Sequence, residues 1–308
     1  IENEDGLFDI VGHSFHTPHD DVAALVSDLM QGNWHAQPRD ARVWTHGQLI
    51  PYPFQRHFSH IAAPGVVDAC SGHVADSAAV AASRNFEEWI LRKFGDGVAR
   101  HFMLPYNRKL WARDLAHISH EWVAERVATE SAKALPQKPA RQPLQADSRV
   151  AYPERGGFGA IFNALAQRCA RIETGAEVVH VDATRKLVGT GDGRTHPWKH
   201  LVSTLPLPQL LHMLDGCPAD LIDAASRLQN VSLKVLLILA RLREGDLPQR
   251  IYVADPHVPP HKIAFNHTSS PALRQRARHA ISCEISYSPD KPVAEDGILL
   301  SRTIEWLL

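Results

Sequence analysis

Two hydrophobic periodicities occur in this one chain, and together they restrict its fold more than any other feature. Apolar residues recur every four positions from Phe86 to Phe102, which is the spacing of one helix face. Apolar residues alternate with polar ones from Ile281 to Tyr287, which is the spacing of a strand with one buried face. No internal repeat links the two patterns. The sequence therefore predicts a mixed α/β protein.

Shorter patterns predict the elements near the N-terminus. Residues 7–17 alternate like a strand, and the segment that follows predicts a helix capped by Asp20 or Asp21. Two short strand patterns then flank Gly47, which indicates a β-hairpin. These elements imply a strand, a helix and a hairpin in that order.

A helical region is predicted over residues 84–111. Asn85 stands at its start as an N-cap. Gly95 and Gly97 are expected to split the region into two helices, because glycine costs about 1 kcal/mol inside a helix and is favoured just past its end. A further helix is expected to begin at Ser119.

The second half of the chain alternates again between strand and helix patterns. A proline-containing connection over residues 130–148 marks a boundary. Residues 176–206 read as strands and end in a short apolar strand over 200–206. Short helices are expected near 208–228. The continuous apolar run over 231–242 predicts a central strand of a sheet.

The charge of the chain excludes several classes of partner. Its 308 residues contain 33 Lys and Arg against 34 Asp and Glu, a formal net charge of −1. No global basic field is present to hold nucleic acid or an anionic membrane surface. No apolar run approaches the ~20 residues that span a bilayer, and the first residues lack the order of a signal peptide. A cytoplasmic protein that binds a small molecule is expected.

Cysteine and histidine positions do not predict a metal site. The four cysteines stand far apart, so they are expected to be free thiols. His13, His16 and His19 are spaced by three, which would align them on a helix, but Pro18 interrupts that segment. On a strand His13 and His16 point to opposite faces. Hydrogen-bonded or surface histidines are expected instead of metal ligands.

Four sequence blocks carry the chemical information, since the chain contains no GxSxG, HExxH or P-loop motif. The blocks are FDIVGHSFHT at 8–17; the helical region ending in PYNRKLW at 105–111; GAEVVHVD at 175–182 with LVSTLP at 201–206; and YVAD at 252–255 with PHKIAF at 260–265. Together, in this order, they resemble the UDP-galactopyranose mutases and the related protoporphyrinogen oxidases and amine oxidases. These proteins are FAD-dependent flavoproteins.

The resemblance implies an α/β fold of interleaved parts. The expected parts are an incomplete Rossmann-like FAD-binding half over 1–47 and 149–206, a helical insertion with the proline-rich linker over 48–148, and a mixed-sheet substrate half over 207–308. A sheet shared by residues 7–17 and 176–206 is expected. The family's GxGxxG turn and its C-terminal FAD-closing helix have no counterpart in the 308 residues. We therefore expect an incomplete copy of a flavoenzyme that binds FAD in its complete form, with a naturally shortened relative as the alternative.

The resemblance also assigns cofactor-binding residues. Gly12 and His13 would lie against the isoalloxazine, with His13 as the catalytic residue, although Val11 replaces a glycine usual in the family. Further flavin contacts are expected from Val178 at the adenine and from Thr204, Leu205 and Pro206 near the ring. The alternative for His13 is a hydrogen-bonded core histidine at a strand end, and for Val178 an ordinary core valine.

Substrate residues follow from the same blocks. Tyr106 and Trp111 on the helical region, with Tyr252 and Lys262 on the substrate hairpin, are expected to converge on one pocket. Aromatic walls with one cation suit a ligand that has a planar or sugar portion and a negative group, such as a nucleotide sugar or an acidic metabolite. The alternative is that the two aromatic residues pack between helices and that Lys262 is solvated.

Three functions remain open from the sequence. The leading one is an FAD-dependent oxidoreductase that passes a hydride from substrate to flavin. The first alternative is a sugar isomerase like UDP-galactopyranose mutase. Against it, Glu130 follows Arg126 where the mutase pattern has a second arginine, and Lys262 replaces an arginine. The second alternative is a catalytically silent binding protein.

Overall fold

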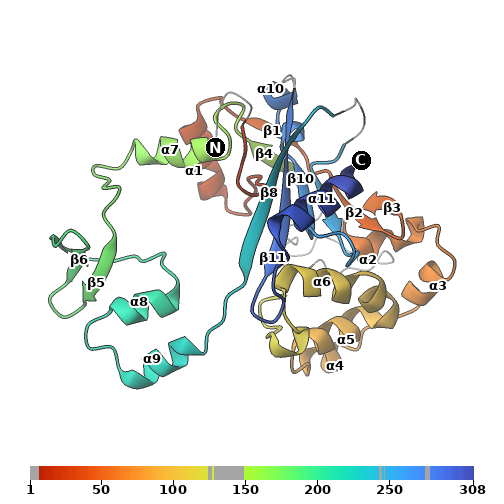
Figure 1. Ribbon diagram of the computed structural model, residues 1–308, viewed down its shortest axis with the longest axis horizontal. Coiled ribbons are helices and arrows are strands. Elements are labelled where there is room, and N and C mark those ends of the chain that lie inside the picture. Colours follow the sequence, from red (N-terminus) through yellow and green to blue (C-terminus); the bar gives the residue numbers. More distant parts are fainter. Residues whose placement is uncertain (1–6, 124–126, 128–148, 243–244, 246, 275–277) are drawn as a thin grey trace. The chain divides into compact units, whose positions relative to one another are not determined.

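The structure is a computed structural model that describes residues 7–123, 127, 149–242, 245, 247–274 and 278–308. Helices and strands are mixed along the chain, which confirms the α/β class (Figure 1). The chain divides into two compact units, residues 1–165 with 231–308, and residues 166–230. The domain boundaries predicted from the sequence stay a prediction. No helix among the described residues is long and apolar enough to cross a membrane.

A six-stranded sheet forms the centre of the first unit, in the order β3-β2-β9-β10-β11-β8. Its strands are β2 (Ala41–Thr45), β3 (Gln48–Pro51), β8 (Ser232–Ala240), β9 (Arg250–Val253), β10 (Lys262–Phe265) and β11 (His279–Tyr287). The hairpin of β2 and β3 around Gly47 confirms the sequence prediction. The pair β2–β9 is parallel and the other pairs are antiparallel.

Strand β8 lies at the edge of this sheet, so the prediction of a central strand for residues 231–242 is wrong. The apolar run does form a strand, but Leu233 and Leu237 are 43% and 37% exposed. A continuous apolar run is typical of a strand covered on both faces, and sequence alone does not reveal that one edge is open.

Helices of the insertion pack beside the sheet. They are α2 (Phe54–His57), α3 (Val66–Cys70), α4 (Ser77–Ala81), α5 (Phe86–Val98) and α6 (Leu104–Trp111). They lie together in the lower right of Figure 1. Phe54, Phe86, Ile90 and Val43 are completely buried between these helices and the sheet. This apolar core fixes α6 relative to the strands.

Helix α5 begins and breaks where the sequence predicts. The Asn85 side chain accepts a hydrogen bond from the backbone N–H of Glu88 at 2.9 Å. Gly95 has φ 74° and ψ 169°, which interrupts the helical backbone. A side chain at Gly95 would also meet the ring of His73 at 2.6 Å. Of the helix expected from Ser119, residues 119–123 form turns and a short 3-10 segment, and residues 124–126 lie outside the described residues. The whole linker at 130–148 also lies outside them.

Residues 7–17 do not form the continuous strand that their alternation predicts. Phe15 makes an isolated antiparallel bridge with Ala151, next to the two-stranded pair of β1 (His35–Pro38) and β4 (Arg149–Tyr152). Elsewhere side chains hold the segment: Ser282 donates to the carbonyl of Asp9 at 3.1 Å. These bonds replace those of a strand ladder.

The helix after this segment, α1 (Asp20–Met30), begins one residue earlier than its predicted caps imply. Its N-cap is His19, and no side-chain hydrogen bond caps it. Asp20 and Asp21 lie in the first turn instead, where their charges favour the positive end of the helix dipole. The remaining helices of this unit are α10 (Pro271–Arg274) and α11 (Asp296–Leu307), with most of α7 (Gly159–Ala166).

The second unit contains a small antiparallel sheet and two helices. Its elements are β5 (Val178–Asp182), β6 (Leu187–Thr190), β7 (Thr195–Pro197), α8 (Leu207–Met213) and α9 (Ala219–Ser226). Gly193, with φ 83°, lies in the turn between β6 and β7. Residues 200–206 form no strand, and Val202 is 89% exposed, so that strand prediction is wrong.

The predicted sheet shared by residues 7–17 and 176–206 is also wrong within the described part of the chain. Strands β5, β6 and β7 pair with one another in sequence order, each through a tight turn. Phe15 pairs with Ala151. Local hairpins pair these strands with one another, and Val181 on β5 also forms a bridge with Leu214.

Candidate functional site

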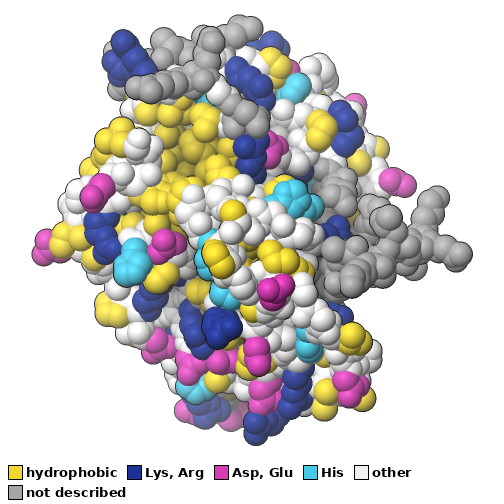
Figure 2. Space-filling view, turned by 90° about the vertical axis from the view of Figure 1, so that its right-hand side faces the viewer, with side chains coloured by type: hydrophobic (Ala, Val, Ile, Leu, Met, Phe, Trp, Pro, Cys, Tyr) yellow, Lys and Arg dark blue, Asp and Glu magenta, His cyan; other side chains and the backbone are white. Residues whose placement is uncertain are grey.

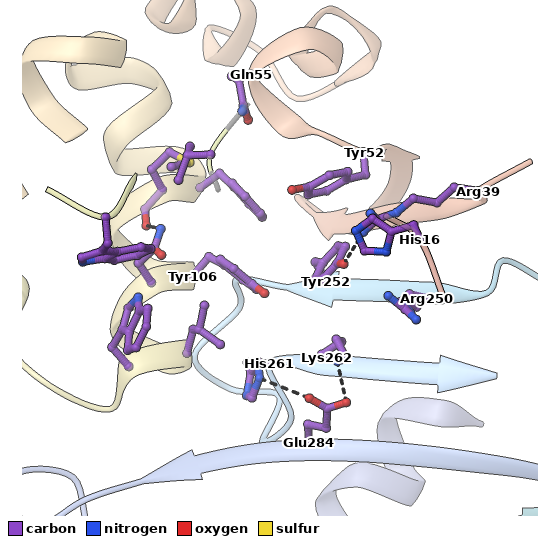
Figure 3. Close-up of a pocket in the computed structure, with 17 residues that line it drawn as sticks. His16, Arg39, Tyr52, Gln55, Tyr106, Arg250, Tyr252, His261, Lys262 and Glu284 are labelled. Atoms are coloured by element: carbon purple, nitrogen blue, oxygen red, sulfur yellow. Dashed lines mark hydrogen bonds and ion pairs between the residues drawn. The ribbon is translucent and has the colours of Figure 1, made fainter. Parts of the chain in front are cut away.

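A cavity of about 570 Å³ lies in the first unit, between α6 and strands β9, β10 and β11 (Figure 3). Its volume falls in the range of sites that bind small molecules. The polar and aromatic residues that line it include His16, Arg39, Tyr52, Gln55, Tyr106, Trp111, Arg250, Tyr252, His261, Lys262 and Glu284.

Strand register places three of these side chains in one row. Lys262 on β10 pairs directly with Tyr252 on β9 and with Glu284 on β11. Residues that face each other across antiparallel strands project to the same side of the sheet. The row therefore presents a phenol, an ammonium and a carboxylate to the cavity, as Figure 3 shows.

Glu284 connects this row to the N-terminal segment. Its carboxylate accepts from Lys262 Nζ at 2.7 Å and from the backbone N–H of Gly12 at 3.1 Å. His261 Nε2 lies 3.9 Å from the other carboxylate oxygen. Glu284 is 5% exposed. Its charge is thus matched by Lys262 and by a backbone dipole.

His261 is held as a neutral imidazole. Burial, followed by the positive charges of Lys262, Lys109 and Lys291, lowers the pKa of His261 to about 3. Its Nδ1 is buried and has no hydrogen-bond partner among the described residues. His261 therefore contributes no positive charge to the cavity at neutral pH.

Two arginines surround the phenol of Tyr252. Arg39 Nη2 donates to the Tyr252 oxygen at 2.9 Å, and Arg250 lies on the same strand two residues away. Burial alone would raise the pKa of Tyr252. The positive charges of Arg39, Arg250 and Lys262 outweigh it and lower that pKa below its ordinary value.

Two further tyrosines form an apolar wall around Tyr252. Tyr106 stacks on Phe102, with ring centroids 5.1 Å apart, and meets the Tyr252 ring edge-on at 5.8 Å. Tyr52 lies 4.8 Å from the Tyr252 ring. Burial and the neighbouring phenols raise the pKa of Tyr106 well above its ordinary value, and burial and Tyr252 raise that of Tyr52. Both phenols stay neutral.

The charge balance of the cavity is positive. Among the described residues that line it, Arg39, Arg250 and Lys262 carry positive charge and Glu284 is the one carboxylate. On the face of the molecule in Figure 2, by contrast, side chains of both signs are interspersed. A local excess of cations beside aromatic rings suits an anion with a planar or sugar portion.

The structure brings all four predicted substrate residues to this cavity. Tyr106, Trp111, Tyr252 and Lys262 line it together. Tyr106 and Trp111 also pack against the helical core, so both side chains have the packing role that the alternative predicts. The alternative of a solvated Lys262 does not hold, because it pairs with Glu284. Their role in substrate binding stays a prediction.

Other residues of the cavity were missed from the sequence. They include Arg39, Tyr52, Arg250, His261 and Glu284. Two signals could have found some of them. Arg250 precedes Tyr252 by two positions and so shares its face of a strand, and Glu284 is the one carboxylate in strand β11. Arg39 stands in a connection between strands with no local pattern around it.

The predicted flavin residues of the first unit are Gly12 and His13, and the backbone N–H of Gly12 donates to Glu284, which lines the cavity. A Cβ at Gly12 would come within 2.3 Å of the Cβ of Ala264, so the sheet itself requires the glycine. His13 is exposed, and its ring stacks on Phe158 at 4.9 Å. The alternative of a buried core histidine is therefore wrong. Exposure leaves the imidazole accessible to a ligand, and its assignment to a flavin stays a prediction.

Replacing Gly12 by alanine should destabilise the protein. We expect a loss of about 1–3 kcal/mol in the free energy of unfolding, because the new methyl group overlaps Ala264. Chemical denaturation measures it. The double variant Gly12→Ala with Ala264→Gly removes the overlap and should recover much of the loss. Equal losses in the single and double variants would show that the contact with Ala264 is not the reason.

The predicted flavin residues of the second unit lie near its surface. Val178 is half-buried on β5, and Thr204, Leu205 and Pro206 are exposed and precede α8. Exposure leaves these side chains open to a ligand, and their assignment to a flavin stays a prediction. Arg126 and Glu130 lie outside the described residues.

Comparisons with known proteins find one matching family and several solved structures with a similar fold. The sequence model of the family "Flavin containing amine oxidoreductase" matches residues 38–300. A reduced UDP-galactopyranose mutase superposes with a TM-score of 0.80 at 24% identity, over 95% of this chain and 66% of that one. A putative protoporphyrinogen oxidase from Exiguobacterium sp. 255-15 gives 0.65 at 13% identity, over 96% and 70%.

A wild-type putrescine oxidase bound to putrescine gives a TM-score of 0.59 at 12% identity, over 92% of this chain and 66% of that one. The chain thus spans about two thirds of the length of these structures. At such identities the likeness is one of fold, and it does not extend to the substrates that the structures' names print.

Proposed function

The chain belongs to the flavin containing amine oxidoreductase family, and from this we propose that it acts as an FAD-dependent oxidoreductase on an anionic small molecule. The cavity of the first unit would bind the substrate. The observation that carries the proposal is the grouping of Arg39, Arg250 and Lys262 with three tyrosines around one cavity. A cytoplasmic location is part of the proposal.

The cavity residues would have separate tasks. Arg39, Arg250 and Lys262 would neutralise the negative group of the substrate, which a buried anion requires. Tyr106 and Trp111 would cover its planar or sugar portion and exclude water. Because Glu284 already accepts from Lys262 Nζ, it would fix the direction from which that ammonium meets the ligand.

A bound flavin would supply two-electron redox chemistry. On the first unit, His13 would contact it, since its imidazole is exposed. Val178, Thr204, Leu205 and Pro206 remain the proposed contacts on the second unit. Adding FAD, removing free cofactor by gel filtration and recording the visible spectrum tests retention by the chain.

Ligand binding tests the substrate part of the proposal without the flavin. UDP-glucose combines a planar base, a sugar and two negative charges, and we expect it to bind with at least roughly tenfold higher affinity than uridine, which lacks the charges. Isothermal titration calorimetry measures both. Equal affinities, or no binding of either, would contradict an anion-binding cavity.

Trp111 provides a specific variant for this test. Trp111→Ala should weaken UDP-glucose binding by roughly tenfold or more, a much larger effect than its effect on the melting temperature. The control is Trp44→Ala, because Trp44 packs on Trp306 in a different cluster and does not line the cavity. It should lower the melting temperature without changing the affinity. Parallel losses of affinity and stability in Trp111→Ala would identify the residue as core.

A second candidate function is a sugar isomerase like UDP-galactopyranose mutase. It is favoured by the TM-score of 0.80 to such a mutase, against 0.65 and 0.59 for the two oxidases. The redox balance of turnover separates the two. Substrate that reduces the flavin and leaves as an oxidised product supports the oxidoreductase, and isomerisation that requires prior reduction supports the mutase. Flavin retention and ligand binding without either reaction would identify a silent binding protein.

A further inference from the structure

Lys109 is a buried lysine whose ammonium group forms hydrogen bonds with the backbone of the protein. It lies on α6 and is 6% exposed. Its Nζ donates to three backbone carbonyls, those of Asp255 at 2.8 Å, Val258 at 2.7 Å and Pro260 at 2.8 Å. An ammonium has three N–H groups, so each one has an acceptor.

These three carbonyls belong to the connection between β9 and β10. The connection leads from the strand that carries Tyr252 to the strand that begins at Lys262. Helix α6, which holds Lys109, carries Tyr106 and Trp111. Lys109 therefore joins the two elements that form opposite walls of the cavity.

We infer that Lys109 is a positioning residue that locks the helical wall of the cavity to its strand wall and so controls ligand affinity. This inference rests on the proposed binding function of the cavity. It concerns a lysine that does not line the cavity itself. Its effect on a ligand must therefore pass through the positions of Tyr106, Trp111 and Lys262.

The protonation state of Lys109 decides whether this lock is complete. A neutral amine has two N–H groups and a lone pair, so it leaves one of the three carbonyls without a donor. Burial and the charge of Lys291 lower the pKa of Lys109 to about 7, while Asp255 opposes them. His261, the other titratable neighbour, is neutral in this range.

The sign of the pH effect follows from these charges. Below pH 7 Lys109 is protonated and holds all three carbonyls. Above that pH it loses a proton, one contact is lost, and affinity for a ligand in the cavity should fall. Removing the positive charge of Lys291 should raise the pKa of Lys109, because repulsion between the two ammonium groups then disappears. The pH at which affinity falls should move upward.

Calorimetric titration of the full chain with UDP-glucose between pH 5.5 and 8.5 tests the inference, because the diphosphate of this probe keeps its charge across the range. Lys109→Met should weaken binding roughly tenfold at pH 6, the scale of one or two lost hydrogen bonds, and its affinity should not change further with pH. Lys109→Arg keeps the charge and the donors, and it should recover part of the affinity and show no decrease above pH 7.

The variant Lys291→Gln keeps the test valid if Lys109→Met fails to fold. It should leave binding at pH 6 unchanged and shift the decrease to higher pH. A readout without ligand is the fluorescence emission of Trp111, obtained as the difference between a protein and the same protein with Trp111→Phe. This emission should change over the same pH range in the wild-type background and stay constant in the Lys109→Arg background.

The outcomes separate the two proposals. If the wild type does not bind UDP-glucose at any pH, the proposed function fails, and the emission difference still tests the lock. If the wild type binds equally at pH 6 and pH 8.5, or if Lys109→Met binds as tightly as wild type, the inference about Lys109 is wrong and the binding function stands. A decrease that Lys291→Gln does not shift would also overturn it.

Discussion

Replacing Glu284 by alanine is expected to lower the free energy of unfolding by about 3–5 kcal/mol, the cost of breaking a buried ion pair by removing one partner. Glu284 is 5% exposed and pairs with Lys262, whose side chain is 18% exposed. The variant leaves that ammonium without its counter-charge and the N–H of Gly12 without its acceptor. Denaturant titration of the purified protein measures the change.

Two further variants serve as comparisons for the stability loss of Glu284→Ala. Glu87→Ala breaks the ion pair of Glu87 with Arg108 near the surface, where such pairs contribute about 0–1 kcal/mol. Glu284→Gln keeps an acceptor for Gly12 and should be less damaging than Glu284→Ala. A loss below about 1 kcal/mol for Glu284→Ala would show that the pair with Lys262 is dispensable for stability.

Replacing Arg39 by methionine is expected to weaken UDP-glucose binding roughly a hundredfold, within the range for removing a buried charge that pairs with a ligand. Arg39 lines the cavity, donates to Tyr252 through Nη2, and has an Nε without a partner among the described residues. A ligand anion would meet this nitrogen. Calorimetry at constant ionic strength measures the effect.

The same variant has a second readout in Tyr252. The charge of Arg39 helps lower the pKa of this phenol, so Arg39→Met should raise it. Ultraviolet absorbance of tyrosinate during a pH titration, with Tyr252→Phe as the reference, detects this change. The control is Arg108→Met, because Arg108 lies half-exposed on α6 and pairs with Glu87 outside the cavity. Similar loss of affinity in both variants would mean that general charge attracts the ligand.

Residues of the candidate site differ in how far the sequence reveals them. Tyr252 and Lys262 stand in a block that resembles the family, and their convergence with Tyr106 and Trp111 was predicted from those blocks. Arg39 was not predicted. Its contact with Tyr252 joins residues 213 positions apart, and no local pattern marks either side of it.

Errors in the fold predictions have a common cause. Residues 7–17 alternate like a strand, but the backbone groups of Asp9 and Gly12 form hydrogen bonds with side chains of β11 instead of with the backbone of a neighbouring strand. The apolar run of 232–240 is a strand, as expected, but lies at the sheet edge. Alternation and apolarity describe which side chains prefer burial, and they do not specify which partner covers them.

The sequence by itself determined the α/β class, the N-cap of α5 at Asn85, the break at Gly95 and the family resemblance. These depend on residues within a few positions of one another or on whole blocks. Only the tertiary structure decided the charge of the cavity and the three acceptors of Lys109. Those depend on strand register and on contacts between residues such as Gly12 and Glu284, 272 positions apart, and burial strengthens such contacts only once the chain has brought them together.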